Sequence, residues 1–470
     1  MKKGELVFIP TPAIGHLVSI VELAKVLVHR DNRFSITVLV MKSSFAPTIT
    51  SYIASIAAST STTGIRFLDL PQVDPPSPEI LKSPEVFIST FIENHKPQVK
   101  HTITNLIESH SVRLAGLVLD LFCVTMIDVA NELGVPSFIF STSSAASLGL
   151  MLHLPTLHHQ IITDFKDSDT DFIIPAFSNP VPPLVLPSVV LTKKSDEYDM
   201  FLKIALRFKE TAGIIVNTFA DLESKAVNWF VELEGQIPPV YPVGPLLVLK
   251  GHTESPSDQI MDWLDKQPPL SVILLCFGSM GSFGVPQVRE IALGLERSGC
   301  RFLWSLRQPS KTELTFPSDY TNPEEVLPDG FLERMDGRGL VCGWVPQVAV
   351  LAHQAIGGFV SHCGWNSILE SLWNGVPILT WPIYAEQQLN AFEMVKELGL
   401  AVEMRLDYRS GADLVTAEEV ERGVRCVMDG DSEIRRKVKE MGGKSKKAVM
   451  EGGSSFSLLG RFIDDLLDKN

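Results

Sequence analysis

The first part of the chain alternates between apolar runs and a helical pattern, and this alternation restricts the fold more than any other feature. Residues 5–10 (ELVFIP) are apolar and end at a proline, which is typical of a short buried strand. Residues 35–41 form a second such run. Between the two, apolar side chains recur at helical spacing at Leu17, Ile20, Val21, Ala24, Leu27 and Val28. This strand–helix–strand order predicts parallel strands joined by a right-handed crossover.

The same alternation continues in both halves of the chain and predicts an α/β protein of two domains. A chain of 470 residues is longer than one hydrophobic core usually organises. In the first half the pattern recurs at residues 115–119, 124–133 and 137–140. In the second half the strand candidates are residues 271–276, 301–306, 339–342, 358–361 and 376–379. Each half is therefore expected to form its own parallel sheet.

Composition also marks the segments between and after the two sheets. A proline-rich stretch at residues 238–245 and a polar stretch at 251–258 indicate a linker. Residues 308–330 are rich in Pro, Asp and Thr and are expected to form a long surface loop. Residues 456–467 are amphipathic and could dock back on the first domain. Open parallel sheets bind ligands outside the carboxyl ends of their strands, so the ligand is expected between the domains.

Charge and composition exclude several classes of protein. With 45% hydrophobic and 20% charged residues the chain has an ordinary globular composition. Its net charge of −14 disfavours nucleic-acid binding, which needs clustered Lys and Arg. Proline and histidine interrupt the apolar N-terminus, and no apolar window is long enough for a membrane span, so neither an export signal nor an integral membrane segment is expected. The six cysteines lie mostly in apolar runs without paired short spacing, which is typical of reduced thiols and predicts a cytoplasmic protein.

Residues 344–387 concentrate aromatic and hydrogen-bonding side chains beyond what an ordinary core needs. A strand at residues 358–361 turns at His362-Cys363-Gly364 into a helix, whose unsatisfied N–H groups form a site for an anion. The side chains suited to a nucleoside diphosphate sugar are Trp344 for stacking, Gln347, His362, Asn366 and Ser367 as donors, and Glu370, Glu386 and Gln387 for hydroxyl groups. A second turn, Phe277-Gly278-Ser279, offers another phosphate donor in Ser279.

A histidine and an aspartate follow two strands of the first sheet. His16 lies in the loop after the first strand, and Asp120 ends the strand at residues 115–119. Both are expected at the carboxyl edge of the sheet, where an imidazole could remove a proton from a hydroxyl group. An aspartate beside it could fix the imidazole tautomer and stabilise the imidazolium.

The run from Trp-Val-Pro-Gln to Ala-Glu-Gln resembles the donor-binding signature of the plant family 1 UDP-glycosyltransferases. The resemblance covers essentially the whole chain. It implies the GT-B fold, in which two Rossmann-like domains with parallel sheets face each other across an interdomain cleft. It also implies an acceptor-binding domain at residues 1–247, a UDP-sugar-binding domain at 248–455 and a C-terminal helix at 456–470 that packs back on the first domain.

The resemblance assigns roles to individual residues. His16 is implied as the general base and Asp120 as its partner. The implied UDP-sugar contacts are Gly15, Thr142, Ser279, Trp344, Val345, Gln347, His362, Trp365, Asn366, Ser367, Glu370, Glu386 and Gln387. The chain departs from the family pattern at Glu386, where Asp is more frequent, and at Val345, where a smaller Ala is frequent. In the family, Gln387 together with Trp365 is associated with glucose as the donor sugar.

These residues imply an inverting transfer of glucose from UDP-glucose, acting as co-substrate, to a hydroxyl group of a small hydrophobic plant metabolite such as a flavonoid, phenylpropanoid or terpenoid. The product would be a β-glucoside, and no metal or other cofactor is expected. A monomer is expected. Two alternatives stay open: a non-catalytic binder of a small phenolic or hormone-like ligand, and the same transferase with another UDP-sugar. The acceptor is not determined, and Phe122 is the one residue suggested for its pocket.

Other motifs in the chain have simpler interpretations. Asp167, Asp169 and Asp171 have the spacing of a metal-binding motif, but Phe172 and Ser178 stand where a calcium loop needs Gly and Glu. A solvated loop is therefore expected. His153, His158 and His159 lack the spacing of a zinc helix and are expected near the acceptor. The sequence has no G-x-G-x-x-G after the first strand and no G-x-S-x-G, which argues against a dehydrogenase and a serine hydrolase.

Overall fold

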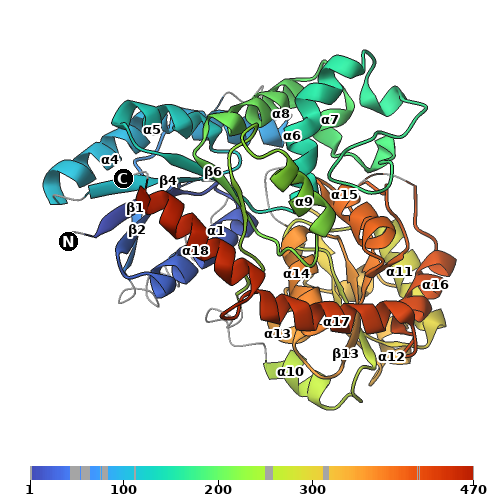
Figure 1. Ribbon diagram of the computed structural model, residues 1–470. Coiled ribbons are helices and arrows are strands. Elements are labelled where there is room, and N and C mark those ends of the chain that lie inside the picture. Colours follow the sequence, from blue (N-terminus) through green and yellow to red (C-terminus); the bar gives the residue numbers. More distant parts are fainter. Residues whose placement is uncertain are drawn as a thin grey trace.

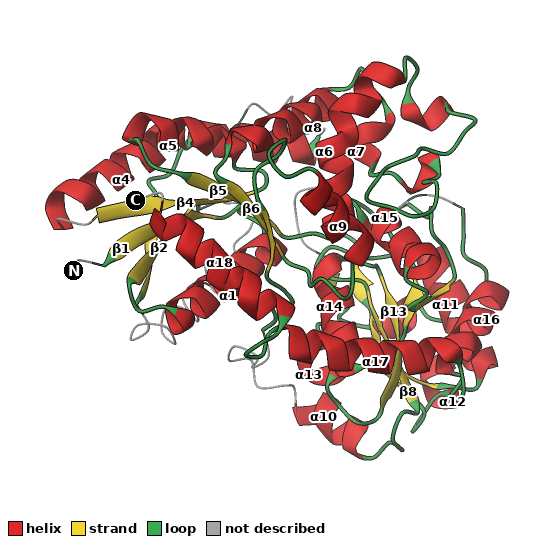
Figure 2. Cartoon of the chain, in the orientation of Figure 1, coloured by secondary structure: helices red, strands yellow, loops and turns green. Residues whose placement is uncertain are grey.

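The fold is described from a computed structural model. The structure describes residues 3–42, 53, 64–74, 76, 83–110, 113–248, 258–310, 317–409, 411 and 413–468. Within these residues the chain forms two separate sheets of parallel strands, one in each half (Figure 1). Helices cover both faces of each sheet (Figure 2), so the predicted pair of α/β domains is confirmed.

The first sheet has the strand order β3-β2-β1-β4-β5-β6-β7 within the described residues, and every pair is parallel. Its strands are β1 (Gly4–Ile9), β2 (Phe34–Val40), β3 (Ile65–Asp69), β4 (Arg113–Asp120), β5 (Ser137–Ser141), β6 (Gly213–Val216) and β7 (Val240–Pro242). The order reverses direction between β1 and β4, which pair from Gly4 opposite Arg113 to Ile9 opposite Leu119, with a register shift after Glu5. Ligands of such sheets bind at this reversal.

Within the described residues, different helices cover the two faces of the first sheet. Helices α1 (Ile14–Arg30) and α18 (Ser454–Asp468) share one apolar core with β1, β2 and β4. The other face carries α3 (Pro84–Asn94), α4 (Lys96–His110), α5 (Ile127–Leu133), α6 (Ala145–Gln160), α8 (Asp196–Arg207) and α9 (Ser224–Glu232). A short helix, α7 (Ser188–Leu191), precedes α8. Because both faces are covered, β1 is buried along its whole length, which explains its continuous apolar run.

The second sheet has the order β12-β9-β8-β13-β14-β15 within the described residues and is also parallel. Its strands are β8 (Val272–Cys276), β9 (Arg301–Ser305), β12 (Gly339–Cys342), β13 (Ile356–Ser361), β14 (Ile378–Thr380) and β15 (Ala401–Glu403). The direction reverses between β8 and β13, so the turns after these two strands lie at the second reversal point.

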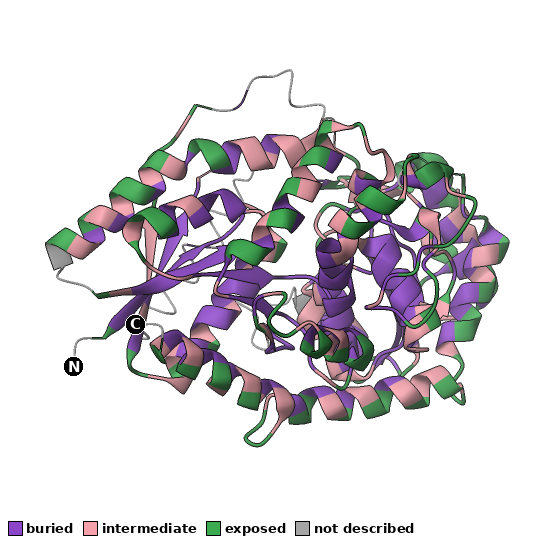
Figure 3. Cartoon of the chain, turned by 45° about the horizontal axis from the view of Figure 1, so that its top comes forward, coloured by how far each residue is buried: buried purple, intermediate pink, exposed green. Residues whose placement is uncertain are grey.

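The helices of the second domain divide between the two faces of its sheet. One face packs against α11 (Val285–Ser298), α12 (Phe331–Arg334) and α16 (Ala417–Met428). The other packs against α10 (Asp258–Asp265), α13 (Gln347–Leu351), α14 (Trp365–Asn374) and α17 (Glu433–Ala448). Helix α15 (Gln387–Phe392) continues into a π-helical turn, Glu393–Glu397. Figure 3 shows that the strands of both sheets are buried while the outer helices alternate between buried and exposed positions.

The strands predicted from sequence agree with the observed ones to within one or two residues at each end, while β3, β6, β7 and β15 were not predicted. Strand β7 lies inside the proline-rich stretch expected to be a linker and pairs with β6 as an edge strand, where proline is tolerated. Most of the predicted polar stretch at 251–258, residues 251–257, lies outside the described residues. The predicted loop at 308–330 contains a short antiparallel pair, β10 (Arg307–Gln308) and β11 (Ser318–Asp319).

The last helix returns to the first domain. Phe462 on α18 is fully buried and makes edge contacts with Phe138, at 5.1 Å between ring centroids, and with Tyr241, at 5.4 Å. The Tyr241 hydroxyl donates to the Asp465 carboxylate over 2.6 Å. Figure 1 shows α18 lying beside α1 on the same side of the sheet. No helix in the described part of the chain is long and apolar enough to cross a membrane.

Replacing Phe462 by alanine should lower the free energy of unfolding by about 3–5 kcal/mol, because it leaves a cavity between α18 and the first sheet. Denaturant unfolding measures this loss. The matched control is Phe456→Ala on the same helix, where the ring is only partly buried beneath Arg30 and a smaller loss is expected. Equal losses for the two variants would contradict the docking of α18.

Candidate active site

His16 and Asp120 meet at the strand reversal of the first sheet. His16 lies in the first turn of α1, directly after β1, and Asp120 is the last residue of β4. Because β1 and β4 are parallel neighbours, their carboxyl ends bring the two side chains together. The Nδ1 atom of His16 is 2.8 Å from Oδ2 of Asp120. The Asp120 side chain is fully buried, whereas 25% of the His16 side chain is exposed.

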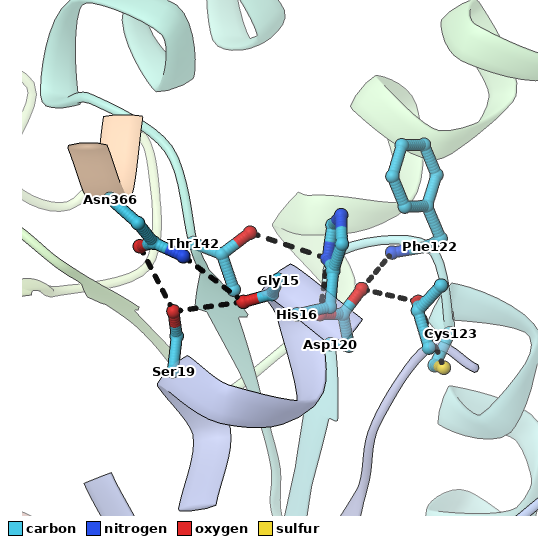
Figure 4. A network of polar contacts seen from close by, with 9 residues as sticks. Gly15, His16, Ser19, Asp120, Phe122, Cys123, Thr142 and Asn366 are labelled. Carbon is cyan, nitrogen blue, oxygen red and sulfur yellow. Dashed lines mark hydrogen bonds and ion pairs between the residues drawn. The ribbon is translucent and has the colours of Figure 1, made fainter. Parts of the chain in front are cut away.

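The buried carboxylate is fixed by further donors (Figure 4). Its Oδ1 atom accepts from the Thr11 hydroxyl over 2.5 Å and from the Phe122 backbone N–H over 3.1 Å. A carboxylate only accepts hydrogen bonds, so Nδ1 of His16 carries a proton and Nε2 is the basic nitrogen. Figure 4 shows Nε2 pointing away from this network. The Thr142 hydroxyl also lies 3.3 Å from Nδ1.

The pKa of His16 lies above its ordinary value. Burial opposes the imidazolium and lowers the pKa, but the charge and hydrogen bond of Asp120 and the charge of Glu386 raise it and outweigh burial. Glu386 belongs to the second domain, so both domains contribute to the charge around this imidazole. His16 is therefore a base whose proton affinity exceeds that of a free imidazole.

The turn after β13 forms the anion site predicted from sequence. Cys363 has a left-handed backbone (φ 62°), and Gly364 begins α14 without a side-chain cap. The first N–H groups of α14 therefore remain open, at the positive end of the helix dipole. The His362 ring packs between two glycines: a Cβ atom at Gly364 would lie 2.5 Å from its Nε2 atom, and one at Gly278 would lie 2.6 Å away. Glycine at both positions is what admits the ring.

His362 is buried and neutral at this turn. Burial lowers its pKa to about 4, and its Nδ1 atom has no partner within the described residues. A neutral imidazole with an unused ring nitrogen could donate to a phosphate oxygen. Ser279, which follows Gly278 after β8, is partly buried close to the same turn.

The first turn of α14 contacts the first turn of α1. The Asn366 amide donates to the Gly15 carbonyl over 3.2 Å, and Ser19 donates to the Asn366 side-chain oxygen over 3.1 Å. Helix α1 also begins without a side-chain cap. The N-termini of α1 and α14, one from each domain, therefore lie side by side without side-chain caps. His16 belongs to the first turn of α1.

A polar cluster extends from this helix toward α13. The Gln347 amide donates to the Ser367 hydroxyl over 2.8 Å and to the Glu370 carboxylate over 2.7 Å. Burial raises the pKa of Glu370 to about 7, although the Gln347 hydrogen bond opposes this shift. Trp344, which precedes this cluster, keeps 54% of its side chain exposed, with the Arg307 guanidinium 5.5 Å from the ring centroid. An exposed indole beside hydrogen-bonding groups can stack with a nucleobase.

Glu386 and Gln387 lie at the start of α15 in the second domain. The Ser143 hydroxyl of the first domain donates to Glu386 over 3.1 Å. The side-chain oxygen of Gln387 accepts from the Ile383 and Tyr384 backbone N–H groups, over 2.9 and 3.0 Å, which fixes the orientation of the amide. Both side chains therefore have defined positions, and the charge of Glu386 acts on His16.

The chain is similar over its whole length to known proteins. Residues 238–431 match the family model described as UDP-glucoronosyl and UDP-glucosyl transferase. UDP-glycosyltransferase 71K1 of Malus domestica is 55% identical, covering 100% of both chains. UDP-glucose flavonoid 3-O-glucosyltransferase 6 of Fragaria ananassa is 52% identical, covering 99% of both. The crystal structure of Medicago truncatula UGT71G1 complexed with UDP-glucose has a TM-score of 0.90 at 50% identity, covering 99% of this chain and 98% of that one.

The chain is a plant family 1 UDP-glycosyltransferase.

Membership of this family confirms the GT-B fold and identifies the chain as a glycosyltransferase that takes a UDP-sugar as donor. It excludes the non-catalytic binder as an interpretation. In the glycosyltransferase, two predicted contact residues have side chains directed into the protein. Val345 is buried in the core of the second domain, and Trp365 is buried with its indole N–H donating to the Asn217 carbonyl over 2.7 Å.

Several residues that organise this glycosyltransferase site were not found from sequence. Thr11, Ser19, Ser143 and Asn217 bind or orient the predicted residues. Each is an ordinary polar residue whose partner lies far away in the chain, and no local pattern distinguishes it. The one available signal was position, since Thr11 directly follows a predicted strand and Ser143 lies three residues after another.

The other motifs lie outside the hydrogen-bond network described above. Asp167, Asp169 and Asp171 are exposed. In the part of the chain that the structure describes, no three His, Cys, Asp or Glu side chains are arranged to hold a metal ion. His158 contacts the Tyr198 hydroxyl over 2.8 Å, and His153 packs edge-on against Trp229.

Replacing Asp120 by asparagine should lower the pKa of His16, because the opposing effect of burial remains while the carboxylate charge is lost. Titration of the imidazole signals by NMR measures this change. His95, whose pKa burial lowers, is remote from Asp120 in sequence and serves as the internal reference. A His16 pKa that stays the same or rises in the variant would contradict the assigned interaction.

Proposed function

We propose that this glycosyltransferase transfers glucose from UDP-glucose to a hydroxyl group of a small hydrophobic plant metabolite and gives a β-glucoside. The observation that carries the proposal is the position of His16. Its ring is held by Asp120 at the first turn of α1, and that turn contacts the open N-terminus of α14. A base and an anion site from different domains thus lie together.

The second domain, residues 248–455, is proposed to hold the donor. The Trp344 ring would stack on uracil, and Gln347 and the main chain of Val345 would contact its edge. Glu370 would accept from the ribose hydroxyls. The diphosphate would bind the N-terminus of α14 with His362, Asn366, Ser367, Ser279 and the backbone at Gly15 as donors. Glu386 and Gln387, with Thr142 from the first domain, would bind the sugar hydroxyls.

Catalysis follows from this arrangement. Nε2 of His16 takes the proton of the acceptor hydroxyl, whose oxygen attacks the anomeric carbon from the face opposite the diphosphate. Asp120 stabilises the imidazolium that forms. The α-linked donor sugar is inverted to a β-linked product. Negative charge develops on the leaving diphosphate, where the helix N-terminus and the donors named above stabilise it. These donors supply the stabilisation without a metal ion, so we propose that none is required.

The first domain, residues 1–247, is proposed to bind the acceptor. The Phe122 ring lies 5.5 Å from the His16 ring between centroids and 6.2 Å from Phe201. An aromatic wall beside the base suits a flat phenolic ring. The name of one relative, a UDP-glucose flavonoid 3-O-glucosyltransferase, supports an acceptor of this kind. Phenylpropanoids and terpenoids fit the same chemistry, because apolar pockets discriminate weakly among hydrophobic shapes.

We also propose a monomer that works in the cytoplasm, with residues 456–470 completing the first domain. All six cysteines are free, which suits a reducing compartment. The alternative donor is another UDP-sugar. The ratio of kcat/KM values for UDP-glucose and UDP-galactose decides between donors, and the anomeric proton coupling constant of the product decides its stereochemistry. An α-linked product would overturn the single displacement.

Replacing His16 by alanine should reduce kcat by about 10²–10⁴-fold, because the general base is lost. UDP affinity, measured by calorimetry, should remain. The matched control is His159→Ala, where an exposed imidazole is removed elsewhere in the same domain and activity should persist. Full activity of the His16 variant would rule out this base.

Replacing Trp344 by alanine should weaken UDP binding by about 5- to 150-fold, which corresponds to the loss of one base-stacking contact. Calorimetric titration with UDP measures the effect, and the acceptor KM should be unchanged. Trp263→Ala removes a partly buried indole from the same domain and is the control. If both variants bind UDP as the parent does, the nucleobase lies elsewhere.

A further inference from the structure

Thr11 lies behind the His16–Asp120 pair. Its side chain is buried, with 2% of the residue exposed, and its hydroxyl donates to Oδ1 of Asp120 over 2.5 Å. The imidazole of His16 approaches the other oxygen of the same carboxylate, Oδ2 (Figure 4). Thr11 therefore contacts Asp120 rather than His16 itself, and its side chain is buried away from solvent.

The local sequence fixes the Thr11 backbone. Prolines stand on both sides of it, at positions 10 and 12, and each locks its own φ angle. The Ala13 N–H donates back to the Thr11 carbonyl over 2.7 Å, which tightens the turn. Thr11, whose hydroxyl binds Asp120, and His16, whose imidazole binds the same carboxylate, thus lie only five positions apart in the chain. A rigid loop sets the spacing of the three groups.

Two donors on Oδ1 restrict the orientation of the Asp120 carboxylate more tightly than one. With only the Phe122 N–H bound, at 3.1 Å, the group could rotate about its Cβ–Cγ bond and move Oδ2 out of line with His16. With the Thr11 hydroxyl also bound, the plane of the carboxylate is defined. Hydrogen bonds to ionised acceptors are about twice as strong as neutral ones, so the loss of this donor has a measurable effect.

We propose that Thr11 is a positioning residue for the glycosyl transfer, whose hydroxyl orients the Asp120 carboxylate toward the imidazole of His16. It contacts neither substrate and acts through Asp120. The inference depends on His16 being the base, which the His16→Ala variant tests separately. If that variant stays active the proposed function fails, whereas the Thr11 variants test only the orientation of its partner.

The charged and titratable groups near this network come from three places. Asp120 ends β4, Glu386 lies before α15 in the second domain, and both raise the pKa of His16. The Cys123 thiol lies 3.9 Å from the Thr11 hydroxyl, and burial raises its pKa well above the ordinary value, so it stays neutral. Of the two carboxylates, Thr11 contacts only that of Asp120 in the described structure, so a change at Thr11 should act on His16 through Asp120.

The test replaces Thr11 by valine, which keeps the shape and removes the hydroxyl. We expect kcat to fall at least about tenfold, because the Asp120 carboxylate loses a hydrogen bond to a charged acceptor. The KM values for UDP-glucose and acceptor should not change. The acidic limb of the pH profile of kcat/KM should move to lower pH, because a misaligned Asp120 raises the pKa of His16 less. Thr11→Ser keeps a hydroxyl that can donate to Asp120, so this variant should retain most of the activity and the parental position of the acidic limb.

The control is Thr37→Val on β2, which removes an equally buried hydroxyl that donates to the Glu5 carboxylate in the same sheet. It should leave the pH profile unchanged. Thr11→Ala provides a second deletion if the valine variant folds poorly, and circular dichroism with thermal unfolding shows which variants are folded. The proposal would be overturned if a folded Thr11 variant kept the parental kcat and pH profile. It would also be overturned if Thr11→Ser did not restore activity, or if the acidic limb of kcat/KM moved to higher pH.

Discussion

The hydrogen bond between His16 and Asp120 is the contact on which the rest of the site depends. It exists because β1 and β4 are parallel neighbours at the strand reversal of the first sheet, so the chain leaves both at the same edge. The carboxylate is buried and has its other oxygen occupied, while the imidazole keeps one nitrogen directed away from it. Burial alone would lower the pKa of His16, and the neighbouring carboxylates reverse that direction. The fold thus makes a stronger base at a position open to a substrate.

The second requirement is that the donor half meets this base in a fixed geometry. The second sheet reverses between β8 and β13, and the turns after these strands hold Gly278 and His362. Polar contacts between the domains lie close to the site itself, from Asn366 to Gly15 and from Ser143 to Glu386. The helix N-terminus proposed to bind the diphosphate is therefore positioned by the same contacts that position the base. Changes in domain arrangement would alter binding and catalysis together.

Much of this could be predicted from the sequence. Strand and helix periodicity located the strand before His16, the strand that ends at Asp120 and the strand before the turn at His362. Such buried strands have continuous apolar runs. Short edge strands such as β7 were missed, since proline masks their pattern. Contacts between distant segments could not be predicted either: the indole N–H of Trp365 binds the Asn217 carbonyl in the other domain, 148 positions away in the chain. Local sequence specifies elements and turns, whereas tertiary packing decides where a side chain points.

The most direct measurement is a crystal structure of the glycosyltransferase with an unreactive UDP-glucose analogue and a phenolic acceptor. The account predicts uracil on Trp344, the diphosphate at the N-terminus of α14, and the acceptor oxygen within hydrogen-bonding reach of Nε2 of His16, about 2.6–3.2 Å. A nucleotide bound away from α14, or an acceptor hydroxyl that His16 does not approach, would contradict it.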